Sequence, residues 1–216
     1  MKNVIVLFGK PGAGKGTRLS EFLEGKENSF DVLSVGNLLR KAKKDQTELG
    51  KLAATYMDSG ELVPDDIING IIIEALKNTT KPIFTDGFPR TVGQATAMLE
   101  AGIEPAVVIE FYVDDEVVLE RSRNRIVCDS CNETYTLSDF KPPKIEGICD
   151  KCGGTLGKRA DDNEDVVKER LEVYQNKTYP TLEVFKKANV PTVTINNEDA
   201  ETGCKQFAQL MSTLFN

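Results

Sequence analysis

Hydrophobic positions fall into short runs that alternate with stretches of helical periodicity. Runs of apolar and β-branched residues predict five strands, at residues 4–8, 31–35, 81–86, 106–113 and 190–195. Apolar residues at helical spacing predict helices at 15–24, 38–57, 64–76, 163–187 and 200–214, the second of them broken near residue 45. Two further helices are predicted, one that ends near residues 101–102 and one that starts at residue 114. Strands that alternate with helices indicate an α/β fold, with a five-stranded parallel sheet flanked by helices.

The segment 126–160 interrupts this alternation. It holds four cysteines and two prolines and has little helical period. We interpret it as a small module inserted into the α/β fold.

Composition narrows the function classes. The 216 residues correspond to roughly one domain. The longest apolar runs are far shorter than the ~20 residues of a membrane span, and the first residues lack a signal-peptide pattern, so we expect a cytoplasmic protein without a membrane partner. A net charge of −7 disfavours general nucleic-acid binding. The absence of histidine excludes Ser-His-Asp and Cys-His catalysis and histidine metal ligands.

Residues 9–17 form a glycine-rich loop between a predicted strand and a predicted helix. They fit the pattern G-x-x-x-x-G-K, with Thr17 one position later than the usual Ser or Thr. Glycines let consecutive N–H groups point at a phosphate, the following helix adds its positive end, and Lys15 can reach the β- and γ-phosphates. The loop predicts a P-loop nucleotide enzyme, without separating kinases from GTPases and ATPases.

The cysteines of the inserted module are spaced as metal ligands. Cys128-x₂-Cys131 and Cys149-x₂-Cys152 are separated by seventeen residues, which is typical of a structural Cys₄ zinc site. Disulfides are disfavoured in the expected compartment. Iron or cobalt could occupy the same thiolates. No role is expected for Cys204.

A second motif narrows the family. Residues 86–91 read Asp-Gly-Phe-Pro-Arg-Thr, and residues 14–17 read Gly-Lys-Gly-Thr. With the segments 34–40, 60–65, 142–147, 161–164 and 170–171, they occur in the order found in adenylate kinases, and the chain resembles the zinc-containing, long-lid bacterial members of that family. The resemblance implies reversible transfer between ATP and AMP to give two ADP, with Mg²⁺ and with structural Zn²⁺, by a monomer that serves adenine nucleotide homeostasis.

The resemblance also implies a three-part architecture. A P-loop NTPase-like core would comprise residues 1–32, 63–123 and 163–216, a helical AMP-binding insert residues 33–62, and a zinc-binding lid residues 124–162. Closure of the insert and the lid would exclude water, which otherwise hydrolyses ATP.

Site residues are implied by matching motifs. The catalytic set is Lys15, Arg90, Arg125, Arg159, Arg170 and Asp86, the last as the residue that holds Mg²⁺ through water. The ATP-binding set is Gly12, Ala13, Gly14, Lys15, Gly16, Thr17, Arg121, Arg125 and Asp199. The AMP-binding set is Ser34, Gly36, Arg40, Glu61, Leu62, Val63, Gly87, Arg90, Gln94, Arg159 and Arg170. Six of the eight arginines thus fall in the expected site, which suits the guanidinium because it binds phosphate oxygens bidentately.

The missing histidine agrees with this chemistry. The nucleophile is an AMP phosphate oxygen that is already ionised, so positioning and charge neutralisation suffice without a general base.

The chain departs from the family pattern in several places. The lid hinge reads Asn124-Arg125-Ile126 instead of Gly-Arg-Arg, Asn37 replaces an aspartate, and Gly93 replaces a common proline. Thr136 stands where histidine is frequent, and the C-terminal loop 196–199 lacks the usual Asp-Gly. These departures bear on the donor-base contact and on lid closure.

Two alternatives follow from the sequence. One is a nucleoside-monophosphate kinase with another base preference, such as a UMP or CMP acceptor or a GTP donor, although the long cysteine lid argues against the short-lid UMP/CMP kinases. The other is a non-catalytic module that senses nucleotide or zinc. A zinc ribbon that binds nucleic acid is disfavoured by the net charge.

Overall fold

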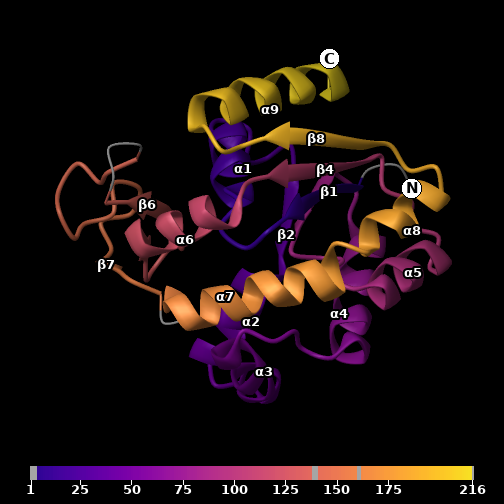
Figure 1. The fold of residues 1–216 in the computed structure, drawn as a ribbon, viewed down its shortest axis with the longest axis horizontal. Coiled ribbons are helices and arrows are strands. Elements are labelled where there is room, and N and C mark those ends of the chain that lie inside the picture. Colours follow the sequence, from indigo (N-terminus) through magenta and orange to yellow (C-terminus); the bar gives the residue numbers. More distant parts are fainter. Residues whose placement is uncertain (1–3, 138–140, 160–161, 216) are drawn as a thin grey trace.

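A five-stranded, all-parallel sheet forms the centre of the computed structural model, which describes residues 4–137, 141–159 and 162–215 (Figure 1). The strand order is β2-β3-β1-β4-β8, and every pairing in this sheet is parallel. Its strands are β1 (Val4–Gly9), β2 (Asp31–Ser34), β3 (Ile83–Asp86), β4 (Val107–Tyr112) and β8 (Thr192–Asn196). The predicted P-loop NTPase-like fold class is therefore confirmed.

Helices cover both faces of this sheet. They are α1 (Lys15–Leu23), α2 (Val35–Lys44), α3 (Glu48–Ser59), α4 (Asp65–Asn78), α5 (Val92–Glu100), α6 (Asp115–Asn124), α7 (Glu164–Val173), α8 (Thr181–Lys187) and α9 (Ala200–Phe215). Side chains of β1 alternate between two cores: Val4 and Val6 pack with α4, α5 and α8, whereas Ile5 and Leu7 pack with α1 and α9 on the other face. Burial on both faces explains why β1 is an uninterrupted apolar run.

No helix among the described residues is both long and apolar enough to cross a lipid bilayer.

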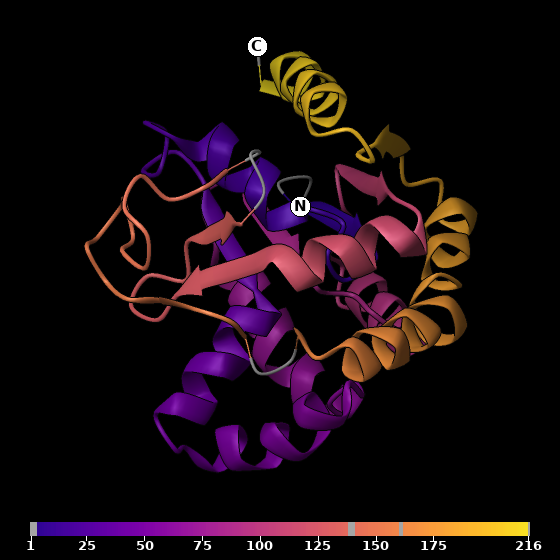
Figure 2. The ribbon, with the colours of Figure 1, turned by 60° about the vertical axis from the view of Figure 1, so that its left-hand side comes forward.

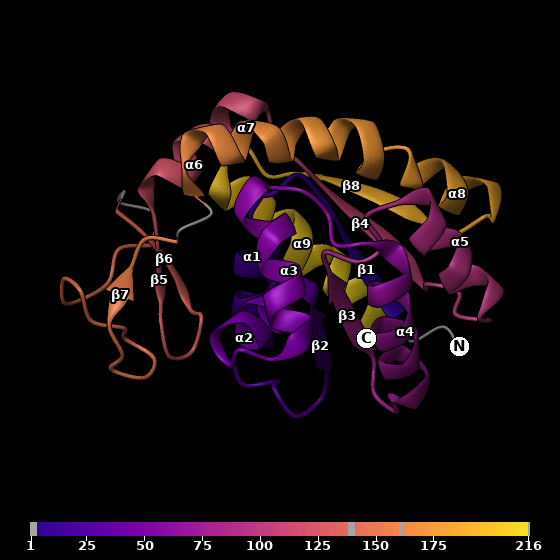
Figure 3. The same ribbon diagram turned by 90° about the horizontal axis from the view of Figure 1, so that it is seen from below.

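Two smaller units lie near the carboxyl ends of the central strands. Helices α2 and α3 pack together as one unit, and the other is the antiparallel sheet β6-β5-β7. Its strands are β5 (Arg125–Cys128), β6 (Thr134–Thr136) and β7 (Leu156–Gly157). Figure 2 shows β5 running on directly from α6, and Figure 3 shows the small sheet at one end of the molecule, beside α2. The Lys44 ammonium at the end of α2 donates to the Asp129 carbonyl oxygen at 3.2 Å, so the two units are in contact.

The predicted break near residue 45 is confirmed, because α2 ends at Lys44 and α3 begins at Glu48. The Thr47 hydroxyl accepts a hydrogen bond from the Gly50 N–H and caps α3. Helix α2 begins at Val35, three residues earlier than expected.

The predicted helix over 163–187 is present but interrupted. Helix α7 gives way to a π-helical turn, η2 (Tyr174–Thr178), before α8. The Tyr179 N–H donates to the Tyr174 carbonyl oxygen at 2.8 Å, a bond that spans five residues. Pro180, which has no N–H, follows and ends the regular ladder.

Phe84 of β3 belongs to an aromatic cluster on one face of the central sheet. It is fully buried, and its ring centroid lies 5.9 Å from Phe22, 5.6 Å from Phe30 and 6.4 Å from Phe215 of α9. The Phe84 ring therefore links β3 to α1, to the segment before β2 and to α9 in one core.

We expect Phe84→Ala to lower the free energy of unfolding by about 3–5 kcal/mol, because it removes a buried ring and leaves a cavity. Urea denaturation followed by circular dichroism measures the change. Val92→Ala is the control, since Val92 is 45% exposed and should change the value by at most about 0.5 kcal/mol. A loss below about 1 kcal/mol in Phe84→Ala would show that the Phe84 ring contributes little to the stability of the core.

Candidate functional site

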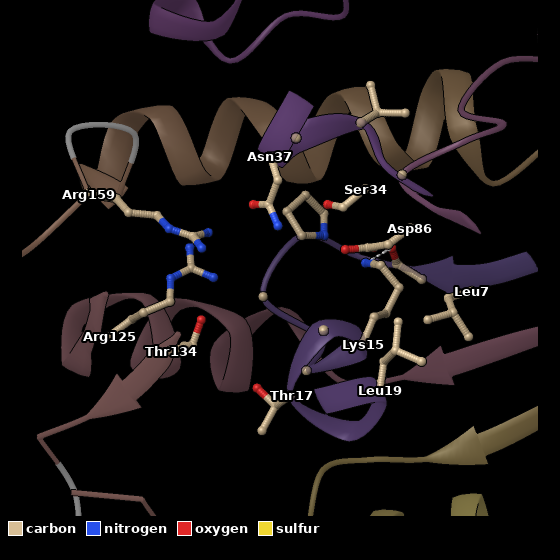
Figure 4. A pocket seen from close by; sticks show the side chains of 18 of the residues that line it. Leu7, Lys15, Thr17, Leu19, Ser34, Asn37, Asp86, Arg125, Thr134 and Arg159 are labelled. Carbon is tan, nitrogen blue, oxygen red and sulfur yellow. Dashed lines mark hydrogen bonds between the residues drawn. The ribbon is translucent and has the colours of Figure 1, made fainter. Parts of the chain in front are cut away.

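One cavity of about 770 Å³ lies beyond the carboxyl ends of β1, β2 and β3. Its walls come from the glycine-rich loop, from α2 and the turn after α3, from the turn after β3, and from the small sheet. In parallel α/β folds ligands bind at this edge of the sheet, because the strand ends and helix N-termini meet there. Side chains of the candidate site residues line this cavity (Figure 4).

The glycine-rich loop turns sharply between β1 and α1. Gly12 and Gly14 have φ values of 81° and 87°, which a side chain rarely permits. Gly14 is the N-cap of α1, and no side chain caps this helix. The first N–H groups of α1 are therefore available to an anion, with the positive end of the helix dipole behind them.

The Lys15 ammonium lies on the floor of the cavity. It donates to the carbonyl oxygens of Gly9 at 2.8 Å and Lys10 at 2.9 Å. Burial lowers its pKa to about 8; the Asp86 carboxylate opposes this shift, while Arg90 and other nearby cations add to it. Figure 4 shows the Lys15 and Asp86 side chains beside one another.

Asp86 itself ends β3, directly above the start of α1. A Cβ atom on Gly16 would lie 4.0 Å from its Oδ2 atom, so the carboxylate faces the helix N-terminus. Thr17, in the first turn of α1, also lines the cavity. A carboxylate and a hydroxyl are oxygen donors of the kind that Mg²⁺ prefers.

All six arginines expected at the site line this one cavity, although they come from different elements. They are Arg40, Arg90, Arg121, Arg125, Arg159 and Arg170. The Arg125 and Arg159 guanidinium groups approach one another across the open space in Figure 4. Convergence of so many cations is unfavourable in an empty cavity and favourable around a polyanion.

Neighbouring groups hold the guanidinium groups in place. The Arg125 guanidinium pairs bidentately with the buried carboxylate of Asp162, and the Arg40 guanidinium donates to Asn37 Oδ1 at 2.7 Å. The Arg90 Nε–H donates to the Gly87 carbonyl oxygen at 3.0 Å. Such contacts position arginines before a ligand arrives.

Arg121 connects α6 to the loop that follows β8. Its Nη2 atom donates to the carbonyl oxygens of Asn197 at 2.6 Å and Glu198 at 2.9 Å. Its Nη1 atom is buried and makes no hydrogen bond within the part of the chain that the structure describes. This donor lies at the cavity wall near Gly14 and suits a polar ligand atom.

Two of the predicted ATP-binding residues do not line the cavity. Ala13 is fully buried beneath the loop. The Asp199 carboxylate is exposed and accepts a hydrogen bond from the Thr202 N–H at the start of α9, which holds its pKa below the usual range. Their assignment stays a prediction; the remaining predicted P-loop positions line the cavity.

The predicted AMP-binding residues all line the cavity. They are Ser34, Gly36, Arg40, Glu61, Leu62, Val63, Gly87, Arg90, Gln94, Arg159 and Arg170. Gln94 is only 3% exposed, so a solvent-facing role on its helix is excluded.

The four cysteines of the small sheet converge into one cluster. Their sulfur atoms all lie within 4.8 Å of one another, with Cys128 Sγ 3.4 Å from Cys152 Sγ and Cys131 Sγ 3.6 Å from Cys149 Sγ. A tetrahedral zinc with Zn–S bonds of about 2.3 Å places its sulfurs about 3.8 Å apart. No disulfide joins any of the chain's five cysteines, all of which are described. The donor set therefore fits a structural zinc ion.

Surrounding groups lower the pKa of two of the four thiols, Cys128 and Cys149, whereas burial raises the pKa of Cys131 and the neighbouring Cys128 sulfur raises that of Cys152. Burial alone would raise the pKa of Cys149, but the hydrogen bonds that its sulfur accepts from the Tyr135 hydroxyl and from the backbone of Cys152 and Lys151 lower it to about 6. A Cβ atom on Gly154 would lie 2.9 Å from Cys128 Sγ, so only glycine leaves room for the sulfur there. A deprotonated thiol is the form that binds zinc.

Asn197, which is 1% exposed, has a structural role that the sequence pattern did not predict. Its Nδ2 atom donates to the Ala13 carbonyl oxygen at 2.6 Å, and its Oδ1 atom accepts from Arg18 Nε at 3.1 Å. It thus ties the C-terminal loop to the P-loop and to α1. The only signal in the sequence was an asparagine where the family pattern has a different residue.

Comparison with known proteins agrees with this geometry. The family model for adenylate kinase matches residues 7–190. The chain is 40% identical over 210 residues to an adenylate kinase of Caldicellulosiruptor saccharolyticus, covering 94% of this chain and 95% of the relative. It is 41% identical over 216 residues to one from a Geobacillus species, covering 97% of each chain, and 43% identical over 194 residues to one from Staphylococcus aureus, covering 86% and 88%.

Removal of metal should destabilise the small sheet. We expect the purified chain to hold about one zinc, and a chelator or Cys128→Ser to lower the melting temperature, because the cluster replaces much of the apolar core that this unit lacks. Calorimetry with metal analysis measures both effects. Cys204→Ser is the matched control, since Cys204 is exposed on α9. An unchanged melting curve with no bound metal would sink the zinc assignment.

The lowered pKa of Lys15 predicts a pH effect. Below about pH 8 the free chain carries the cation, and above it the charge is lost, whereas a bound triphosphate favours the charged form. Affinity for ATP should therefore fall by about tenfold per pH unit above pH 8, and binding near pH 8 should take up a proton.

Titration calorimetry in buffers of different ionisation enthalpy measures both quantities. Lys15→Arg is the control, because its guanidinium stays charged throughout this range and should give a flat profile. Equal pH profiles for the two proteins would show that Lys15 does not titrate near pH 8.

Proposed function

The chain belongs to the adenylate kinase family, whose enzymes transfer a phosphoryl group to a nucleoside monophosphate. We propose that this chain catalyses ATP + AMP ⇌ 2 ADP with Mg²⁺. The observation that carries the proposal is the convergence of Lys15 and six arginines on one cavity at the P-loop. This gathering of positive charge suits a triphosphate and a monophosphate bound side by side.

The donor triphosphate occupies the P-loop side of the cavity. Backbone N–H groups at the start of α1 and the Lys15 ammonium bind its phosphates, and Arg121 with the loop 197–198 borders its base. Supporting this placement are the uncapped N-terminus of α1 and the unsatisfied Nη1 atom of Arg121.

The acceptor AMP occupies the side lined by α2, α4 and α5. Arg40 and Arg90 grip its phosphate, while Ser34, Gln94 and the backbone of residues 61–63 border its base. Supporting this placement, these residues line the same cavity as the P-loop. The two phosphate groups then face each other between the P-loop and the arginines.

Transfer needs no general base. An ionised oxygen of the AMP phosphate forms a bond to the γ-phosphorus as the bond from that phosphorus to the bridging oxygen breaks, and ADP is left on each side. Arg125, Arg159 and Arg170 stabilise the charge of the transferring group, because guanidinium forks match its equatorial oxygens. The complete absence of histidine from the chain agrees with such a mechanism.

Asp86 and Thr17 would hold Mg²⁺, Asp86 through water. When bound, the ion neutralises phosphate charge. The oxygen donors of these two side chains beside the P-loop support the assignment.

We further propose that residues 33–62 form the monophosphate-binding insert and residues 124–162 the lid, both closing on the core formed by 1–32, 63–123 and 163–216. The α2–α3 pair and the cysteine-bearing sheet fall inside these limits. Arg125 and Arg159 both belong to the lid, so closure brings them to the transferring phosphoryl group. Zinc stiffens the lid without joining the chemistry.

A coupled assay of ADP formation tests the proposed reaction. With ATP and Mg²⁺ fixed, AMP should be turned over faster than UMP, CMP or GMP. Lys15→Met should lower turnover by at least about 100-fold, because it removes a cation that contacts the transferring charge. Lys26→Met, which changes an exposed lysine after α1, should leave turnover unchanged.

Two outcomes would contradict the proposal. If UMP, CMP or GMP is turned over faster than AMP, that monophosphate is the preferred acceptor and AMP is not. Purified wild-type chain that binds ATP without forming ADP would instead make this chain a nucleotide sensor.

A further inference from the structure

We propose that Asp65 is a positioning residue that locks the side-chain amide of Gln94 in one orientation and thereby makes the acceptor site select adenine over 6-oxopurines. The inference rests on the proposed function, in which Gln94 borders the acceptor base. Asp65 is the first residue of α4, 29 positions before Gln94, and nothing in its sequence context suggested more than an acid in the first turn of a helix.

The Gln94 amide is bonded at both ends. Its Nε2 atom donates to Asp65 Oδ1 at 2.8 Å, and its Oε1 atom accepts from the Arg90 N–H at 2.7 Å. Both partners require the same orientation, because a carboxylate only accepts and a backbone N–H only donates. Turning the amide by 180° would place its oxygen against the carboxylate and its NH₂ group against the Arg90 N–H.

Asp65 is itself held in place. Its Oδ2 atom accepts from the Thr91 hydroxyl at 2.5 Å, and the same hydroxyl oxygen accepts from the Gln94 N–H at 3.0 Å as the cap of α5. A Cβ atom on Gly93 would lie 2.8 Å from Asp65 Oδ2. Glycine at position 93, one of the departures from the family pattern, therefore leaves room for the carboxylate in this position.

The locked amide keeps one N–H and one oxygen lone pair for a ligand, in a fixed order. Adenine offers the complementary order, since its exocyclic amino group donates and its N1 atom accepts. Hypoxanthine and guanine offer the reverse, because O6 accepts and N1–H donates. An amide that could turn freely would bind both kinds of base. An amide held by Asp65 binds adenine, whereas a 6-oxopurine in the same place leaves buried polar groups without hydrogen bonds.

The test compares kcat/KM for AMP and for IMP at saturating ATP and Mg²⁺. We expect Asp65→Leu to lower the AMP-to-IMP ratio by at least about tenfold, mainly through a higher KM for AMP, with the KM for ATP unchanged. Asp65→Asn should keep the ratio near the wild-type value, because its amide oxygen can still accept from Gln94 and its NH₂ group can donate to Thr91. This rescue separates positioning from the charge of the helix terminus.

Asp66→Leu is the matched control, since it removes the neighbouring first-turn acid of α4, whose side chain is exposed. It should leave the ratio unchanged. If Asp65→Leu does not fold, Gly93→Ala provides the test, because the added methyl group displaces the Asp65 carboxylate and should lower the ratio in the same direction.

The outcomes separate the two proposals. A wild-type chain that forms no ADP from AMP contradicts the proposed function and, with it, the role of Asp65. A wild-type chain that favours AMP, together with a folded Asp65→Leu or Gly93→Ala variant whose ratio stays within twofold, contradicts the role of Asp65 alone.

Discussion

Repulsion among the cations around one cavity is the constraint on which the rest of this arrangement depends. The chain carries a net charge of −7, yet Lys15 and six arginines line the same space. The repulsion is visible in the lowered pKa of Lys15, where Arg90, Arg170 and Arg125 all add to the effect of burial. Hydrogen bonds and carboxylates inside the fold offset part of this repulsion, and a bound polyanion would offset more of it.

The supports come from different parts of the fold, which ties the site to its architecture. Arg125 depends on Asp162, 37 residues away, and Arg121 depends on carbonyl oxygens of the C-terminal loop, 76 and 77 residues away. Asn197 links that loop to the P-loop across 184 residues. Movement of the α2–α3 pair or the small sheet therefore changes which cations face the cavity, which is a physical reason for the proposed reaction to be coupled to closure.

The cysteine cluster bears on the stability of the small sheet. Among its described residues, the core cluster consists of Ile126, Cys128, Tyr135 and Cys149, with Leu156 packed against them. So few apolar side chains stabilise a folded unit weakly, and a metal bound by the four thiolates would supply stability that the core lacks. A more rigid sheet would in turn fix Arg125, which begins β5, relative to the other strands of this sheet.

The sequence by itself determined those features that depend on residues close together in the chain. The strand–loop–helix order around Lys15, the two Cys-x₂-Cys pairs and the alternation of strands and helices all follow from local spacing and periodicity, because backbone geometry acts over a few residues. Matching motifs also identified the arginines that line the cavity. The interruption of 163–187 was missed, because a π-helical turn has no distinct apolar pattern and depends on how α7 and α8 pack.

Only the tertiary structure decided which partner each polar side chain takes. Gln94 was expected from its motif to border a base, but its orientation comes from Asp65 on another helix, and Asn197 becomes an anchor only because the last loop returns to the P-loop. Hydrogen bonds require donor and acceptor to meet within about 3 Å. That meeting is a property of the folded chain as a whole, and residue spacing along the sequence does not encode it.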